Sequence, residues 1–328
     1  MKAFANANAR TLQQAVSLAQ QARRDGKTVS FGGGGSDLLT LVKERLVSPD
    51  VIVALRSTGD AAIAQGGRGL TIGGLATLDA ISRDALVRSR YTVLGEAAES
   101  VATPQIRNVA TVAGNVCQRP WCWYYRNSFP CYKNGGTTCF SVTGENQFHA
   151  IFGGGPSYIV HPSDTAPALV ALDATFRIVG PSGTRTAPSA EFFTLPRVDA
   201  KRENALADDE LLAAISVPQP RPGTRSTYHK IMDRETWTHA VVSAAVVLEM
   251  EGGVCREARV VLGGVAPIPW RLPEVEKMLA GQRITPELAA RAGEQAVANA
   301  RPLEKNKYKV PLTRNLVSRT VLELAQKG

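Results

Sequence analysis

The sequence predicts an α+β fold divided into two or three domains. Its 328 residues exceed the roughly 150 residues of an average domain. Segments whose apolar residues recur at helical spacing are mixed along the chain with short β-like runs. The segment from Pro218 to Gly223 contains three prolines and is the best candidate linker, so we expect a domain boundary near residue 223.

Before that boundary, the first expected element is a helix over Thr11 to Asp25. Apolar residues recur there at helical spacing, Thr11 is a suitable N-cap, and Gly26 ends the helix. A second helix is expected over Ala80 to Arg88. The β-like or otherwise apolar runs are Thr28 to Phe31, Leu38 to Val42, Val51 to Leu55, Leu70 to Ile72, Phe176 to Val179 and Leu211 to Val217.

Beyond the boundary, two strands are followed by helices. Ala240 to Glu249 and Glu257 to Leu262 have the composition of strands. The expected helices are Pro273 to Ala280, Pro286 to Ala300 and Pro311 to Gln326.

Composition and charge exclude several classes of protein. Hydrophobic residues make up 44% and charged residues 20% of the chain, which indicates a folded protein with a sizeable core. The longest apolar runs, such as Ala240 to Leu248, are too short to cross a bilayer, so we expect no membrane span. The net charge of +9 comes from dispersed Lys and Arg residues, so we expect no nucleic-acid partner. The N-terminal residues lack a signal pattern, and we expect no export signal in the chain itself.

Glycine-bearing segments at three places suit an anionic ligand. They are Phe31 to Leu38, Thr71 to Leu78 and Arg107 to Cys117. Because glycine lacks a Cβ atom, backbone N–H groups there can turn toward a pyrophosphate and approach it closely. Neither a dinucleotide-binding fingerprint nor a Walker loop is present, and each segment alone fits an ordinary turn at least as well. A fourth motif, His161 to Leu169, places Ser163 and Asp164 before an apolar helix, where either residue could be the N-cap.

Four cysteines are clustered in the middle of the chain. Soft thiolates suit an iron–sulfur cluster and a structural zinc ion alike, and the intervals fit neither a zinc ribbon nor a ferredoxin run. The spacing therefore leaves both kinds of centre open, and it favours ligand chemistry over a disulfide framework. Cys255 lies apart and is expected to be a small buried hydrophobe. The clustered cysteines are Cys117, Cys122, Cys131 and Cys139.

In order and spacing, the four motifs resemble those of the FAD-binding subunits of the molybdenum hydroxylases, the group of xanthine dehydrogenase and carbon monoxide dehydrogenase. The likeness continues through Tyr228 to Glu235, Val242 to Ala245, Leu262 to Arg271 and Tyr308 to Leu312. It implies a two-part FAD-binding domain of the p-cresol methylhydroxylase type at residues 1–223, with subdomains 1–55 and 56–223 and a four-cysteine insertion at 117–139. Residues 224–328 would form a smaller C-terminal α/β domain of the carbon monoxide dehydrogenase flavoprotein type.

The same resemblance implies which residues bind FAD. Lys230 or Arg234 would reach the flavin from the C-terminal domain, and a surface ion pair is the alternative for either. His149 and His161 show no metal spacing, so we expect them to form hydrogen bonds in loops. The implied FAD-binding residues are Gly33, Gly34, Gly35, Ser36, Asp37, Leu38, Gly73, Asn108, Thr111, Gly114, Asn115, Ser163, Asp164 and Lys230.

The cysteine segment is similar to an insertion found in part of that family. In the flavin subunits of aldehyde oxidoreductases and of 4-hydroxybenzoyl-CoA reductase, four cysteines hold a [4Fe-4S] cluster. The resemblance lies in Cys117-Gln-Arg-Pro-Trp-Cys-Trp-Tyr-Tyr-Arg126 and in His149 to Gly154. It implies that Cys117, Cys122, Cys131 and Cys139 hold such a cluster, in preference to zinc.

These implications describe an oxidoreductase subunit that transfers electrons and oxidises no substrate itself. A molybdenum-cofactor subunit and a [2Fe-2S] subunit would complete a hetero-oligomer, and FAD would pass electrons to an external acceptor. The compartment would be the cytoplasm, or the periplasm if the chain is exported folded with a signal-bearing partner. The alternatives are a self-sufficient flavin reductase or oxidase, for which we find no acid or base constellation, and a zinc-stabilised binding module.

Overall fold

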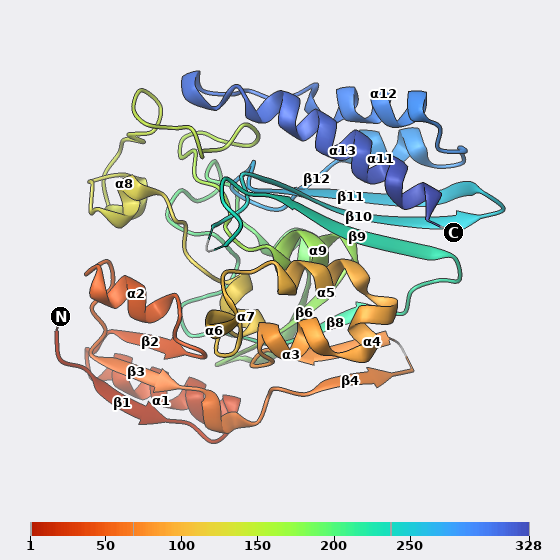
Figure 1. Ribbon diagram of the computed structural model, residues 1–328. Coiled ribbons are helices and arrows are strands. Elements are labelled where there is room, and N and C mark those ends of the chain that lie inside the picture. Colours follow the sequence, from red (N-terminus) through yellow and green to blue (C-terminus); the bar gives the residue numbers. More distant parts are fainter. Residues whose placement is uncertain (1, 68, 237, 328) are drawn as a thin grey trace.

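The N-terminal part of the chain is a small parallel sheet covered by a helix (Figure 1). The computed structural model describes residues 2–67, 69–236 and 238–327. In sheet order, the strands are β1 (Ala5–Asn8), β3 (Val51–Ala54) and β2 (Val29–Gly32). Helix α1 (Leu12–Arg24) buries the apolar face predicted for it, and Thr11 Oγ1 accepts a hydrogen bond from Gln14 N at 3.1 Å as its N-cap. The apolar run after the glycines is a helix, α2 (Leu38–Lys43).

A larger antiparallel sheet follows. Its order is β4 (Ile63–Gly66), β5 (Gly69–Gly73), β8 (Leu211–Pro218), β6 (Thr175–Gly180) and β7 (Gly183–Pro188). Strand β8 closes the sheet between β5 and β6 although it comes last in sequence, so residues that are far apart in the chain share one core. The short helices of this region are α3 (Leu78–Arg83), α4 (Ala85–Arg90), α6 (Pro104–Arg107), α7 (Val112–Val116), α8 (Trp123–Arg126) and α10 (Ser189–Phe192).

The C-terminal part is an antiparallel sheet between two layers of helices (Figure 1). Its order is β12 (Trp270–Arg271), β11 (Val254–Gly263), β10 (Val242–Glu251) and β9 (Thr224–Ile231). One face carries α11 (Pro273–Leu279), α12 (Pro286–Val297) and α13 (Lys309–Gln326), and the other carries α5 (Thr92–Glu99) and α9 (Thr165–Ala171). Because helices cover both faces, β10 is buried continuously from Val242 to Glu249.

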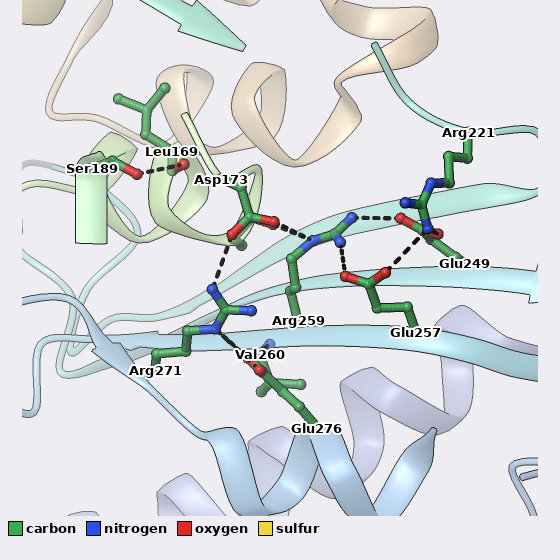
Figure 2. Close-up of polar contacts among 11 residues, drawn as sticks. Leu169, Asp173, Ser189, Arg221, Glu249, Glu257, Arg259, Val260, Arg271 and Glu276 are labelled. Atoms are coloured by element: carbon green, nitrogen blue, oxygen red, sulfur yellow. Dashed lines mark hydrogen bonds and ion pairs between the residues drawn. The ribbon is translucent and has the colours of Figure 1, made fainter. Parts of the chain in front are cut away.

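An ion-pair seam joins α9 to the C-terminal sheet (Figure 2). Asp173, just after α9, accepts from Arg271 Nη1 at 2.9 Å and lies 3.3 Å from Arg259 Nε. Arg259 also pairs with Glu249 at 3.0 Å and with Glu257 at 2.5 Å, so its charge is balanced although its side chain is only 12% exposed. This seam links the end of α9 to strands β10, β11 and β12 of the C-terminal sheet.

The structure departs from the sequence expectations at a few elements. The helix expected over Ala80 to Arg88 is two helices, because Asp84 is extended and its Oδ1 caps α4 by accepting from Val87 N at 3.0 Å. Strand β9 was not expected, since its sequence alternates poorly between apolar and polar residues. Within the ranges that the structure describes, no helix is both long and apolar enough to span a bilayer.

Candidate functional site

A cavity of about 710 Å³ lies where the glycine run meets the loops before α3 and α7. The run follows β2 and precedes α2, so the parallel sheet holds one end of it and a helix holds the other. Of the residues expected from the sequence, Thr111 and Gly114 line this first cavity together with the whole stretch from Gly33 to Leu38. Backbone N–H groups of such a loop are suitable donors for a pyrophosphate.

Contacts within the chain themselves require glycine at several of these positions. A Cβ atom on Gly34 would lie 1.8 Å from the Val109 carbonyl oxygen, and one on Gly73 would lie 2.3 Å from that of Asp60. Gly35 has a φ of +79°, which a residue with a side chain rarely adopts. Any other residue at these positions would therefore push apart the loops that build the cavity.

A second cavity, of about 450 Å³, adjoins the first. Both are lined by Ser36, Asp37, Gly114 and Gln118, which marks the junction between them. Beyond the junction, the walls come from four parts of the chain, since Asn115, Trp121, Asp164 and His239 all line the second cavity. Together the two adjoining cavities are large enough for a cofactor of the size of FAD.

The Asp37 carboxylate is neutralised by the cysteine segment. Its Oδ1 accepts from Arg126 Nη2 at 2.9 Å, and its Oδ2 accepts from the backbone N–H of Arg119 at 2.9 Å. The Arg126 guanidinium is only 6% exposed, also pairs with Glu44 at 3.1 Å, and lies 4.1 Å from the centre of the Trp121 ring. Asp37 thus joins the glycine run to residues 119–126 and presents little uncompensated charge to an anionic ligand.

Asn115 and Ser163 form one buried hydrogen-bond group. Asn115 Oδ1 accepts from Ser163 Oγ and from Thr165 Oγ1, each at 2.6 Å. Ser163 Oγ in turn accepts from Ala166 N at 3.0 Å, so Ser163 is the residue whose side chain caps α9. His161 Nδ1 accepts from Ser163 N at 3.3 Å. These contacts fix Asn115, whose other amide atom can donate to a ligand in the second cavity.

Asp164 accepts hydrogen bonds from the C-terminal domain. Its Oδ2 pairs with Lys230 Nζ and its Oδ1 accepts from Tyr228 Oη, each at 2.7 Å, and Lys230 also donates to the Ser100 carbonyl at 3.0 Å. Burial, and then the Asp164 charge, raise the pKa of Tyr228 well above its ordinary value, so its hydroxyl remains a donor. The alternative to flavin contact that the sequence left open for Lys230 was a surface ion pair. Lys230 does form an ion pair, but the pair is buried and joins the two domains.

Several expected residues lie outside the cavity walls. Gly73, Asn108, Ser163 and Lys230 line neither cavity. Asn108 is exposed at the end of α6, and the other three act through the contacts described above. Sequence reasoning did not select Leu75, Gln118 or His239, which line the cavities; Leu75 and Gln118 lie within quoted motifs, and His239 lies in none.

The cysteines do not all meet. Cys122, Cys131 and Cys139 line one small cavity, whereas Cys117 lines the first cavity and packs against the main core. Burial raises the pKa of Cys117 to about 12 and that of Cys122 to about 11, so both are neutral thiols without a metal. Among the described residues, no group of His, Cys, Asp or Glu side chains is arranged to hold a metal ion. The predicted set of four cysteines is thus not assembled, for zinc or for a cluster.

Cys122 connects the cysteine cavity to the second cavity, because it lines both. Its Sγ lies 3.3 Å from His149 Nε2. Burial, and then the charge of Lys309, lower the pKa of His149 to about 4, so the ring is neutral near pH 7. Any redox centre held by Cys122 would therefore adjoin a ligand in the second cavity.

Comparisons with known proteins identify the family to which the sequence is similar. Residues 2–220 match the family model described as the FAD binding domain in molybdopterin dehydrogenase, and residues 227–324 match the CO dehydrogenase flavoprotein C-terminal domain. The chain is similar to the aldehyde oxidoreductase FAD-binding subunit PaoB of Escherichia coli (strain K12), with 32% identity over 333 aligned residues covering 98% of each protein. It is also 26% identical to the carbon monoxide dehydrogenase medium chain of Hydrogenophaga pseudoflava, over 95% of this chain and 93% of the relative.

Solved structures agree at the level of the fold. A chain of the reconstituted CO dehydrogenase from Oligotropha carboxidovorans superposes with a TM-score of 0.78, at 22% identity and over 99% of both chains. The predicted α+β fold, a FAD-binding domain followed by a smaller C-terminal domain, is confirmed.

Proposed function

Because this chain belongs to the family of FAD-binding subunits of the molybdenum hydroxylases, we propose that it is the electron-transfer subunit of an aldehyde-oxidising member of that family. In this proposal, a molybdenum-cofactor subunit oxidises the substrate and a [2Fe-2S] subunit relays the electrons to this chain. FAD supplies the step from two-electron to one-electron chemistry, and the chain passes electrons to an external acceptor. Residues 1–223 would hold the flavin and residues 224–328 would close over it.

The observation that carries the proposal is the pair of joined cavities at the glycine run. Ser36, Asp37 and Gly114 lie at the junction, where the backbone N–H groups of the run would hold a pyrophosphate. Asp164 and Asn115 would orient the other end of the cofactor from the second cavity.

Aldehyde as the substrate class is supported by the similarity to the aldehyde oxidoreductase subunit of E. coli, which extends over nearly the whole of both chains. Relatives named for carbon monoxide and for xanthine share less identity with this chain, at 26% and 27%. The substrate would bind to the molybdenum subunit, so this chain would influence the acceptor and the rate of reoxidation.

We further propose an iron–sulfur cluster, of the [4Fe-4S] type, beside the flavin. Support comes from the thiols of Cys122, Cys131 and Cys139 around one cavity and from the wall that Cys122 shares with the second cavity. Thiolates are the ligands that such clusters prefer, and a cluster next to FAD would exchange electrons with it directly. The compartment would be the cytoplasm, or the periplasm if a signal-bearing partner carries the folded complex across the membrane.

Copurification from the native host tests the proposal. We expect the chain to elute with a molybdenum-containing and a [2Fe-2S] subunit, to carry FAD, and to support aldehyde-dependent reduction of an artificial acceptor. A visible spectrum that shows flavin alone, in a chain that elutes without partners and turns over a small substrate itself, would favour a self-sufficient flavin reductase or oxidase. A colourless chain containing zinc would favour the binding module.

A further inference from the structure

A cavity of about 430 Å³ lies where the linker joins the two domains, apart from the flavin site. Its walls come from the end of α4, the linker between β8 and β9, the start of β9 and the end of α13. Among the described residues, none lines both this linker cavity and either cavity of the flavin site. In Figure 1, α4 and the end of α13 lie on the side of the molecule opposite α2, which borders the first cavity. A ligand bound in the linker cavity would therefore be separate from the flavin.

The walls of the linker cavity are strongly cationic. Arginine and lysine side chains account for four of its lining residues, and no lining residue that the structure describes is acidic. Arg90 and Lys327 form no ion pair with any described carboxylate. The Lys327 charge acts on Glu323 of α13, but Glu323 is itself paired with Arg319. The charges of Arg90 and Lys327 are therefore available to a ligand.

The other two cations of the cavity, Arg221 and Arg225, differ from each other. Arg221 pairs with Glu249 at 2.9 Å and with Glu257 at 3.3 Å, so its charge is already balanced. Arg225 donates through Nη1 to the Ala325 carbonyl at 2.7 Å, which fixes its guanidinium against the end of α13. Its other nitrogens form no hydrogen bond among the described residues and can donate to a ligand. Three of the four cations thus lack a carboxylate partner in the part of the chain that the structure describes.

The linker that forms one wall of the cavity has a fixed shape. The Gly223 carbonyl accepts a hydrogen bond from Met250 N at 3.1 Å. Gly223 has a φ of +78°, and a Cβ atom there would lie 2.1 Å from the Met250 carbonyl oxygen. Pro220 and Pro222 restrict the backbone further, because the proline ring fixes φ. The proline-rich segment is therefore a rigid wall, and the cavity is formed before any ligand binds.

The remaining walls provide one hydroxyl donor and an apolar surface. Ser226 Oγ accepts from Val93 N at 3.2 Å, and its own hydrogen has no acceptor among the described residues, so it can donate to a ligand. Pro220, Pro222 and Leu324 also line the cavity. The volume of about 430 Å³ is typical of a site for a small organic molecule. The lining therefore suits a compound that joins an anionic group to an apolar body.

We propose that the linker cavity binds a phosphate monoester, with its phosphate held by Arg90, Arg225 and Lys327. These cations come from three separate elements, so they can surround a tetrahedral group that carries a charge of about −2 on several oxygens. A carboxylate carries a single charge on two oxygens in one plane, which one arginine satisfies. The ligand would link α4 of the FAD-binding domain to β9 and α13 of the C-terminal domain, so binding should stabilise the folded chain.

The test is calorimetric titration of the full chain, loaded with FAD so that the flavin site is filled. The probes are inorganic phosphate and adenosine monophosphate (AMP), with adenosine as the unphosphorylated control and sodium chloride keeping the ionic strength constant. We expect saturable binding of AMP, weaker binding of phosphate and no binding of adenosine. Arg90→Ala and Lys327→Ala should each weaken AMP binding by about tenfold, because each removes a charge-assisted hydrogen bond. Arg291→Ala is the matched control, since it removes an exposed arginine of α12 and should leave the affinity unchanged.

Several results would overturn the proposal. Absence of saturable binding by both probes at millimolar concentration would do so, and so would an unchanged affinity in both Arg90→Ala and Lys327→Ala. An equal loss of affinity in Arg291→Ala would show that the probes sense only the net charge of the chain. Tighter binding of phosphate than of AMP would exclude the monoester and assign the cavity to inorganic phosphate. The proposed electron-transfer function stands or falls separately, by copurification.

Discussion

Asp164 offers the sharpest test of the site, because one carboxylate both lines the second cavity and pairs with the C-terminal domain. The change is Asp164→Ala. It removes the acceptor of two buried donors, Lys230 Nζ and Tyr228 Oη, each 2.7 Å away. Lys230 keeps only its bond to the Ser100 carbonyl, and its charge then has no partner.

The expected magnitude follows from burial. The side chains of Asp164 and Lys230 are 5% and 3% exposed, so water cannot replace the lost partner. Breaking a buried pair by removing one member costs about 3–5 kcal/mol of the free energy of unfolding. The double variant Asp164→Ala with Lys230→Met removes the stranded charge as well, and it should lose less than the sum of the single variants by about 1–3 kcal/mol.

The assay is urea unfolding followed by tryptophan and flavin fluorescence, with FAD per protein measured after gel filtration. Asp164→Ala should also lose FAD, whereas Lys230→Met, which changes a residue outside the cavity walls, should lose less. Arg319→Ala is the control, because its pair with Glu323 is exposed to solvent and its loss should leave the free energy of unfolding almost unchanged. An Asp164→Ala protein with unchanged stability and full FAD occupancy, or a double variant with strictly additive losses, would refute the reasoning.

Other perturbations give further expected outcomes. Gly34→Ala should lower FAD occupancy, because the added Cβ would lie 1.8 Å from the Val109 carbonyl oxygen. Gly66→Ala is the control, since no atom lies within 4 Å of its added Cβ, and equal FAD occupancy in the two variants would contradict the packing argument. Asp173→Asn keeps a residue type that tolerates the φ of 49° but removes a half-exposed charge. In urea unfolding, the free energy of unfolding should fall by about 0.5–1 kcal/mol at low salt and by less at high salt, where ion pairs are screened. Burial lowers the pKa of Lys309 to about 7 from 10.5, so between these pH values the unfolded chain binds more protons than the folded chain. The free energy of unfolding should therefore rise with pH across that window, and Lys309→Met should abolish the rise. The same pH profile in the variant and the unmodified protein would refute this reasoning.

Local sequence signals predicted the elements that depend on local physics. The helix α1 was predicted because its apolar residues lie on one face and Thr11 caps it, and both features are found. The break at Asp84 also had a local signal, since aspartate is a good N-cap, but continuous helical spacing hid it. Strand β9 had no such signal. It is a strand because it pairs with β10 along its length and because Asp164 binds two of its side chains.

For the site, sequence motifs predicted which loops line the cavity but not which residues the side chains of those loops contact. The glycine run lines the first cavity as expected, yet Asp37 is bound to Arg126, which is 89 residues away in the chain. The cysteine count did not predict how the thiols are arranged. Counting groups Cys117 with the other three cysteines, whereas the fold places Cys117 at the first cavity and the other three around a separate small cavity. Such pairings are decided by tertiary packing, which no local pattern contains.

The cysteine segment is therefore part of the flavin site rather than an addition to its surface. Arg126 connects it to the glycine run through Asp37, and Cys122 forms a wall shared by the second cavity and the cysteine cavity. Lys309 of α13 donates to the Phe148 carbonyl at 3.0 Å, so the C-terminal domain holds the end of the same segment. Since one segment contacts the glycine run, the second cavity and the C-terminal domain, loss of the proposed cluster from this segment should weaken flavin binding. Iron-depleted complex should accordingly retain FAD less well than iron-loaded complex, and equal retention in the two forms would show that the flavin site is independent of the cysteine segment.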